Sequence, residues 1–348
     1  MTRLVDLARE VCGFQAQLLS AAELALSARI AGATQEAIRE ELWTRRSLVR
    51  AWTVRGTIHI VAAEDLPLWA AAVGSRRYWE EDEWLARESL TRREAAAIFE
   101  TVVGALSDVP LTREQVAEAV VSRLGATYRS KIASMWGDLL APVTYMGKLC
   151  FGPMRGPNVT FVRADRWIHG WRDAEPDLAW SELLRRYLRA YGPAPLDGVA
   201  RWFGIEPAKA LALLEGLEDA VTTELEGRPA WDLRGEIVPR KAVTSVRLLA
   251  QYDPYVLGCR PHDSIVDPAA RQLIHGYRRG RWEGATGVPV LLIDGVVSGV
   301  WERVAKGKAL SLVVRPAVKL SAAHRRALAD EAGRLGAFFG LPAALSIA

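Results

Sequence analysis

One order of predicted elements occurs three times in this 348-residue chain, with about 80 residues between successive copies. Such internal repetition constrains a fold more strongly than any single segment does. In the first copy, Thr34 is a candidate N-cap for a helix that continues to about residue 43, and residues 45–47 form a turn. A second helix is predicted over residues 48–54, and β-branched alternation predicts a strand over 57–61. Helix, turn, helix and strand in this order indicate a winged helix.

The second and third copies each add a pair of strands after their helices. Thr112 and Gln115 have the spacing of a capping box at the start of the second copy. Residues 152–157, between two of the predicted strands, form a loop that is too long for a tight hairpin. The predicted helices are 112–123, 131 or 134 to 145, 196–203 and 206–217, and the predicted strands are 148–151, 158–162, 221–225 and 230–233.

The pattern changes after about residue 245, where short apolar runs alternate with Gly and Pro. Asp294-Gly295 between the runs 288–293 and 296–301 is a strong hairpin signal, and Ser321 is a candidate cap for a helix to about residue 339. We therefore predict an α+β fold in which tandem winged helices precede a mixed α/β element that contains a β-hairpin. The predicted parts are 1–108 (N-terminal helix and first winged helix), 109–190, 191–244 and 245–348.

Composition excludes several classes of protein. Half of the residues are hydrophobic and a quarter are charged, which is typical of a globular protein rather than a disordered one. The three cysteines are far apart, and the five histidines lack metal-binding spacing, so we predict neither a disulfide framework nor a metal or other cofactor. No leader peptide or membrane span is apparent, which favours the cytoplasm. The charge of +4 permits a nucleic-acid partner without requiring one.

Gln15-Ala16-Gln17 places two neutral amides in a stretch that is otherwise almost wholly apolar or small. Gly13 permits a break from helical geometry, and Ser20 is a candidate N-cap for a helix over residues 21–30. The pair is therefore predicted to lie on a non-helical entry to that helix, where residues two apart point the same way and both amides can converge on one ligand. A pair of structural glutamines that bind backbone groups is the alternative.

Several basic residues are candidates for contact with DNA, although each is also compatible with a solvated surface. Arg55 and His59 bracket the end of the first winged helix, and Asp253, which is followed by Pro254, is more typical of a turn than of a general base. Trp282 adds a stacking group to the clearest basic stretch. The candidates for DNA contact are Arg45, Arg46, Arg50, Arg55, His59, Arg155, Arg278, Arg279, Arg281 and Trp282.

Four segments, 14–17, 55–59, 252–258 and 294–301, resemble motifs of the AlkZ/YcaQ family of bacterial DNA glycosylases, and the similarity extends over essentially the whole chain. The resemblance implies tandem winged helices in a C-shaped scaffold and the removal of bulky or crosslinked N7-alkylated purines from DNA. It also implies that Gln15 and Gln17 are the catalytic pair, because the AlkZ-like branch carries Gln-apolar-Gln where the YcaQ-like branch carries Gln-apolar-Asp.

The chemistry of such a lesion explains how two amides can replace the usual pair of carboxyl groups. A purine alkylated at N7 is already cationic, so it leaves without a general acid, and amide dipoles can stabilise the charge on the sugar and hold a water molecule. The expected protein is a monomeric, monofunctional glycosylase that acts on double-stranded DNA, in a nucleoid-associated cytoplasmic location. A non-catalytic winged-helix regulator, or a winged-helix scaffold that binds proteins, remains the alternative.

Overall fold

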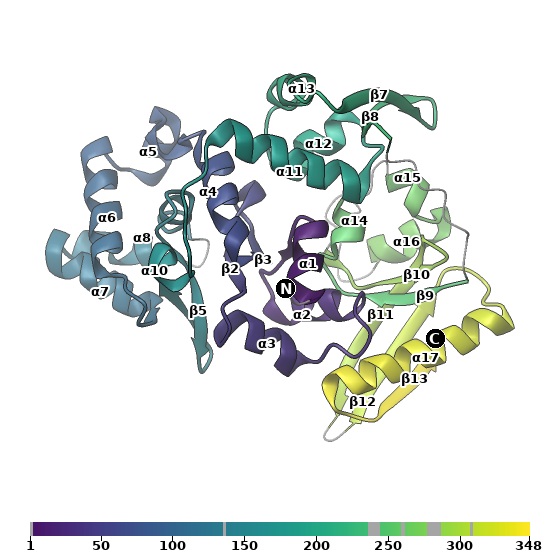
Figure 1. The fold of residues 1–348 in the computed structure, drawn as a ribbon. Coiled ribbons are helices and arrows are strands. Elements are labelled where there is room, and N and C mark those ends of the chain that lie inside the picture. Colours follow the sequence, from purple (N-terminus) through teal and green to yellow (C-terminus); the bar gives the residue numbers. More distant parts are fainter. Residues whose placement is uncertain (1–2, 135–136, 236–243, 259–261, 277–286, 307–308) are drawn as a thin grey trace. The chain divides into compact units, whose positions relative to one another are not determined.

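The computed structural model describes residues 3–134, 137–235, 244–258, 262–276, 287–306 and 309–348. The chain forms two compact units. The discontinuous unit is made of residues 1–38 and 185–348, and the continuous unit is made of residues 39–184. Helices and strands are mixed throughout both units, so the predicted α+β class is confirmed (Figure 1). The four predicted parts are smaller than these units, and their boundaries stay predictions.

The continuous unit contains an antiparallel sheet surrounded by short helices (Figure 1). Its strands lie in the order β3-β2-β5-β6-β4. Helix α3 (Gln35–Trp43) leads into this unit, and α11 (Pro176–Tyr191) leads out of it. The elements between them are β2 (Leu48–Trp52), β3 (Ile58–Ala62), α4 (Leu66–Gly74), α5 (Asp82–Glu88), α6 (Arg92–Ala105), β4 (Leu111–Thr112), α7 (Arg113–Leu124), α8 (Arg129–Ala133), α9 (Ala141–Tyr145), β5 (Cys150–Arg155), β6 (Asn158–Val162) and α10 (Ala164–Trp167).

An aromatic cluster forms the centre of this sheet. The rings of Trp52 and Phe151 lie 4.6 Å apart, and the rings of Phe151 and Phe161 lie 5.1 Å apart, so β2, β5 and β6 share one buried face. The Tyr145 hydroxyl donates a hydrogen bond of 2.9 Å to the carbonyl of Thr53, which fixes α9 to the end of β2. Aromatic pairs at these separations add stability beyond the area that they bury.

The discontinuous unit combines the N-terminal helices with the C-terminal half of the chain. Its five-stranded sheet has the order β13-β12-β11-β10-β9, and β12 and β13 are parallel whereas the other neighbours are antiparallel. Its elements are α1 (Arg3–Glu10), β1 (Phe14–Gln15), α2 (Leu19–Ser27), α12 (Leu196–Phe203), α13 (Pro207–Glu215), β7 (Ala220–Leu225), β8 (Arg228–Leu233), β9 (Val246–Leu249), α14 (Pro254–Gly258), α15 (His262–Ile265), α16 (Pro268–Gly276), β10 (Val290–Ile293), β11 (Val296–Lys306), β12 (Ala309–Pro316), α17 (Ala322–Phe339) and β13 (Ala343–Ile347).

Each repeat contains helices followed by a β-hairpin, although the first copy uses different elements from those predicted. The orders are α2, α3 and β2–β3 in the first copy, α7, α8, α9 and β5–β6 in the second, and α12, α13 and β7–β8 in the third. The helix predicted over residues 48–54 was wrong, because these residues form strand β2 and an adjoining turn. All five residues of β2 are buried, so the strand lacks the alternation that normally identifies one.

Other local predictions had mixed outcomes. The capping box of Thr112, the cap of Ser321 and the hairpin turn at Asp294-Gly295 are confirmed. The long loop at 152–157 was wrong, because β5 continues to Arg155 through an irregularity and only Gly156-Pro157 turns the chain. The helix predicted to end at residue 145 is divided into α8 and α9. In the described part of the chain, every helix is too short or too polar to span a bilayer.

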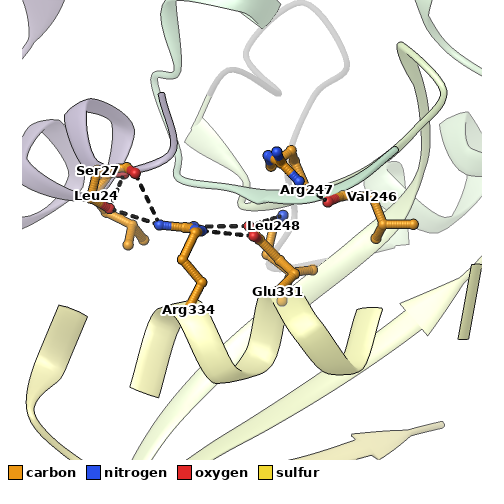
Figure 2. Close-up of polar contacts among 7 residues, drawn as sticks. All are labelled: Leu24, Ser27, Val246, Arg247, Leu248, Glu331 and Arg334. Atoms are coloured by element: carbon orange, nitrogen blue, oxygen red, sulfur yellow. Dashed lines mark hydrogen bonds and ion pairs between the residues drawn. The ribbon is translucent and has the colours of Figure 1, made fainter. Parts of the chain in front are cut away.

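A buried carboxylate joins three elements of the discontinuous unit (Figure 2). Glu331 of α17 accepts hydrogen bonds from Arg334 at 2.7 and 2.8 Å and from the backbone N–H of Leu248 at 3.0 Å. Arg334 also donates to the carbonyl and the hydroxyl oxygen of Ser27 in α2, both at 3.1 Å. Strand β9 is an edge strand, so no further strand of its sheet pairs with its outer side. The Glu331 carboxylate accepts the hydrogen bond from the backbone N–H of Leu248 in place of such a strand.

Removing this carboxylate should destabilise the protein strongly. We expect Glu331→Ala to lower the free energy of unfolding by about 3 kcal/mol. The buried N–H of Leu248 loses its acceptor, and the partly buried Arg334 guanidinium loses its ion-pair partner. Glu40→Ala is the matched control, since Glu40 pairs with Arg45 at the surface and exposed pairs contribute within about 1 kcal/mol. Chemical denaturation of both variants measures the difference, and equal losses would contradict this assignment.

Candidate active site

The end of helix α1 creates the non-helical segment that carries the two glutamines. Cys12 adopts a left-handed conformation with φ 57°, and Gly13 follows with φ 87°. The N–H of Gly13 donates to the carbonyl of Ala8 at 2.8 Å, and the N–H of Cys12 donates to that of Arg9 at 3.2 Å. This pair of bonds is a Schellman motif, which terminates a helix. The predicted break at Gly13 is confirmed.

The segment then continues as the short strand β1 and a bend before α2. The predicted non-helical entry is confirmed, but Ser20 is not the N-cap, because α2 begins at Leu19 and Leu18 occupies the cap position without a side-chain bond. Gln15 is buried, with 8% of its surface exposed, whereas Gln17 is exposed. The pair is therefore not sealed in the interior. That both amides converge on one ligand stays a prediction.

An ion pair between a partly buried guanidinium and a fully buried carboxylate supports this segment from the opposite end of α2. The Arg29 guanidinium lies 5.7 Å from the centre of the Phe14 ring, and it donates two hydrogen bonds to Asp253, at 2.7 and 2.9 Å. Asp253 is fully buried and also accepts from the N–H of Tyr255 at 2.9 Å. Asp253 therefore caps α14, which confirms the turn role favoured by the sequence.

Tyr191 provides a second connection between the glutamine segment and α14. Its hydroxyl donates to the carbonyl of Val11 at 2.8 Å. Its ring lies against Gly258, where an added Cβ would approach the ring to 2.4 Å. Only glycine fits this position without displacement of the tyrosine. Sequence reasoning missed Arg29 and Tyr191. A lone cation at the end of the apolar helix α2 was the available signal, because a partly buried arginine requires a partner.

Arg55 and His59 belong to the β2–β3 hairpin of the continuous unit. Arg55 has φ 59° and ψ 17°, Gly56 has φ 65°, and the N–H of Thr57 donates to the carbonyl of Val54 at 3.1 Å. Two successive left-handed residues with this bond form a type I′ turn, the geometry that suits a two-residue hairpin. Arginine adopts this conformation at a cost that glycine avoids, and such strain is concentrated at functional sites.

His59 is buried and neutral. Its Nδ1 lies 2.7 Å from the Thr53 hydroxyl and 3.2 Å from the carbonyl of Thr57. Because a carbonyl accepts, Nδ1 carries the proton, and Nε2 is free to accept from Arg55 at 3.4 Å. Burial, followed by the nearby charge of Arg55, lowers the pKa of His59 from 6.5 to about 3. With 1% of its surface exposed, His59 orients Arg55 rather than reaching DNA itself.

The remaining candidates differ in their environments. Arg50 is buried and lies 4.5 Å from the centre of the Phe151 ring, which argues against the predicted direct contact with phosphate. The guanidinium of Arg46 lies 3.6 Å from the Trp167 ring centre. Exposed Arg45 pairs with Glu40 and Glu41, each at 3.0 Å.

Arg155, also exposed, lies at the tip of the β5–β6 hairpin. It donates to the carbonyl of Pro110 at 2.8 Å and to the side chain of Gln115 at 3.1 Å. The stretch Arg278, Arg279, Arg281 and Trp282 lies outside the described residues. The structure thus brings Arg45, Arg46, Arg50, Arg55, His59 and Arg155 into the continuous unit, whereas Gln15 and Gln17 belong to the discontinuous one.

Comparison with known proteins identifies the family. A family model described as DNA glycosylase AlkZ-like matches residues 8–338. The chain belongs to the AlkZ-like family of DNA glycosylases. It is 31% identical over 322 residues to an interstrand DNA cross-link repair glycosylase of Streptomyces sahachiroi, with 89% of this chain and 84% of the relative covered. The solved structure of Streptomyces sahachiroi DNA glycosylase AlkZ superposes with a TM-score of 0.83 at 28% identity, covering 99% of this chain and 94% of that one.

This AlkZ-like glycosylase should lose stability in acid because of His59. The unfolded state binds a proton below pH 6.5, whereas the folded state resists it to about pH 3. The free energy of unfolding therefore falls as the pH falls between these values, by up to about 1.4 kcal/mol per pH unit. We expect His59→Gln to flatten this dependence and His169→Gln, at an exposed position, to preserve it. Denaturation curves at several pH values provide the measurement.

Replacing Arg55 should separate stability from DNA binding. We expect Arg55→Gly to keep or raise the free energy of unfolding, by about 1 kcal/mol, because glycine relieves the left-handed strain. Its affinity for duplex DNA should fall, and the slope of log K against log salt concentration should become shallower by about 1, the value of one phosphate contact. Arg55→Ala removes the charge but retains the backbone strain, so it should lose affinity for DNA without any increase in the free energy of unfolding. Unchanged affinity in both variants would exclude Arg55 from the DNA-binding surface.

Proposed function

We propose that this glycosylase hydrolyses the N-glycosidic bond of N7-alkylated purines in double-stranded DNA, with Gln15 and Gln17 as its catalytic residues. The two uncharged amides lie on a non-helical segment that follows the Schellman motif at the end of α1, and the side chain of Gln17 is exposed. This observation is the main support for the proposal. Neither side chain can protonate a leaving group at neutral pH. The substrate must therefore supply a leaving group that already carries positive charge, and a purine alkylated at N7 does.

The reaction balances without a general acid. Water adds to C1′ of the deoxyribose, the bond from C1′ to N9 breaks, and the electron pair of that bond neutralises the cationic purine. The water loses a proton to solvent. The amide carbonyls of Gln15 and Gln17 stabilise the positive charge that develops on the sugar and orient the water. An abasic site with an intact strand is the product of this monofunctional enzyme.

The repair context follows the relative that is described as a cross-link repair glycosylase. A site that recognises charge on the leaving base tolerates a bulky or crosslinked substituent at N7, so we extend crosslink repair to this chain. We place the protein on the bacterial nucleoid in the cytoplasm, where it acts as a monomer whose three winged helices form the contact with DNA. Membership of a glycosylase family favours this function over that of a non-catalytic regulator.

Glutamine variants test the proposal directly. We expect Gln15→Ala and Gln17→Ala each to lower the single-turnover excision rate of N7-methylguanine by about 100-fold or more, the usual cost of removing a preorganised dipole. DNA affinity should change little. Gln272→Ala, at an exposed position on α16, is the matched control and should retain full activity. Abasic sites are counted after alkaline cleavage of the product strand.

Two outcomes would remove the mechanism. Full activity in both glutamine variants would show that the amides are structural. Efficient excision of uracil, a neutral base that departs poorly without activation, would show that the enzyme activates a leaving base by groups other than the two amides.

A further inference from the structure

A pocket of about 180 Å³ opens beside the first turn of α2, in the same unit as Gln15 and Gln17. Its lining includes Ser20, Leu24, Trp301, Glu302, Arg303 and Phe339. Ser20 and Leu24 are four residues apart, so one face of α2 forms one side of the pocket. Strand β11 and the end of α17 contribute the other residues.

Apolar and polar side chains share the lining of the pocket about equally. Trp301 is buried, and its indole N–H is already bonded to the carbonyl of Leu249 at 2.8 Å, so the ring forms a fixed wall. Glu302 pairs with Arg315 at 2.7 Å, which neutralises its charge. The exposed guanidinium of Arg303 lies 4.3 Å from the centre of the Phe339 ring and leaves the rim positively charged. Such a rim favours uncharged groups or acceptors and disfavours a second cation.

Chain geometry places this pocket near the catalytic segment. Three peptide units separate Gln17 from Ser20, so their Cα atoms lie within about 11 Å of each other. In a purine, N7 and the nitrogen of the glycosidic bond belong to the same five-membered ring. A substituent on N7 therefore begins within one ring of the bond that the enzyme breaks, and the lining of the pocket begins at Ser20, three residues after Gln17.

We propose that this pocket binds the N7 substituent of the lesion, and that it selects an uncharged, ring-sized apolar group. The inference rests on the proposed function of the glutamine pair. An apolar cavity of about 150 Å³ holds one benzene molecule, so the volume of the pocket matches one aromatic ring. Leu24, Trp301 and Phe339 supply its apolar contacts, and Arg303 excludes cationic substituents.

Filling the pocket tests the assignment. Single-turnover excision is measured on duplexes that carry N7-methylguanine, N7-benzylguanine or N7-(3-aminopropyl)guanine. Ser20→Phe places a ring at the exposed rim of the pocket and should lower kcat/KM for the benzyl lesion about 10- to 100-fold, the value of burying one aromatic side chain. Excision of the methyl lesion should stay within about twofold of wild type, because methyl does not reach the pocket.

Matched variants separate the causes. Ala329→Phe adds the same ring at an exposed position of α17 that does not line the pocket and should preserve the activity of wild type on both lesions. Arg303→Gln should improve excision of the aminopropyl lesion relative to the benzyl lesion. The methyl lesion also reports folding, so a misfolded variant is recognised at once.

The outcomes distinguish a failure of the pocket assignment from a failure of the proposed glycosylase function. An equal loss on the methyl and benzyl lesions would make the pocket a general DNA contact and overturn the assignment. Unchanged benzyl excision by Ser20→Phe would overturn it as well. Wild-type protein that releases no N7-alkylguanine would refute the proposed function, and the substituent site would fall with it.

Discussion

The ion pair between Arg29 and Asp253 is the interaction on which the candidate active site depends most. Burying a guanidinium and a carboxylate is unfavourable unless each is paired and hydrogen-bonded. Here the pair is bidentate, and the carboxylate also caps α14. The pair joins the end of α2 to a turn 224 residues away, and the same guanidinium lies beside Phe14 of the glutamine segment. A long-range contact thus supports the short segment that carries Gln15 and Gln17 from a distant part of the chain.

In both units a rigid backbone turn holds the candidate functional side chains. A Schellman motif fixes the entry to Gln15 and Gln17, and a strained type I′ turn fixes Arg55 beside His59. Burial keeps the histidine uncharged, so it orients the arginine as a hydrogen-bond acceptor. In both places the backbone conformation, rather than a titrating side chain, determines what the functional group can contact.

Sequence patterns were reliable where local physics decides the structure. The capping box of Thr112, the Asp294-Gly295 turn and the break at Gly13 each depend on residues within a few positions, and all three formed as expected. Residues 48–54 failed because β2 is buried on both faces, so its pattern carries no period of two. The parallel strand β13 was missed because its partner β12 precedes it by a whole helix.

The sequence by itself determined the α+β class, the two helices and the hairpin of the third copy, and the family resemblance that singles out Gln15 and Gln17. Those features lie in contiguous residues, where spacing and propensity act directly. Tertiary structure alone decided that Arg29 pairs with Asp253, that His59 is buried against Arg55, and that a pocket opens beside α2. Burial and charge pairing depend on which distant residues pack together, and packing is a property of the folded chain rather than of any local pattern.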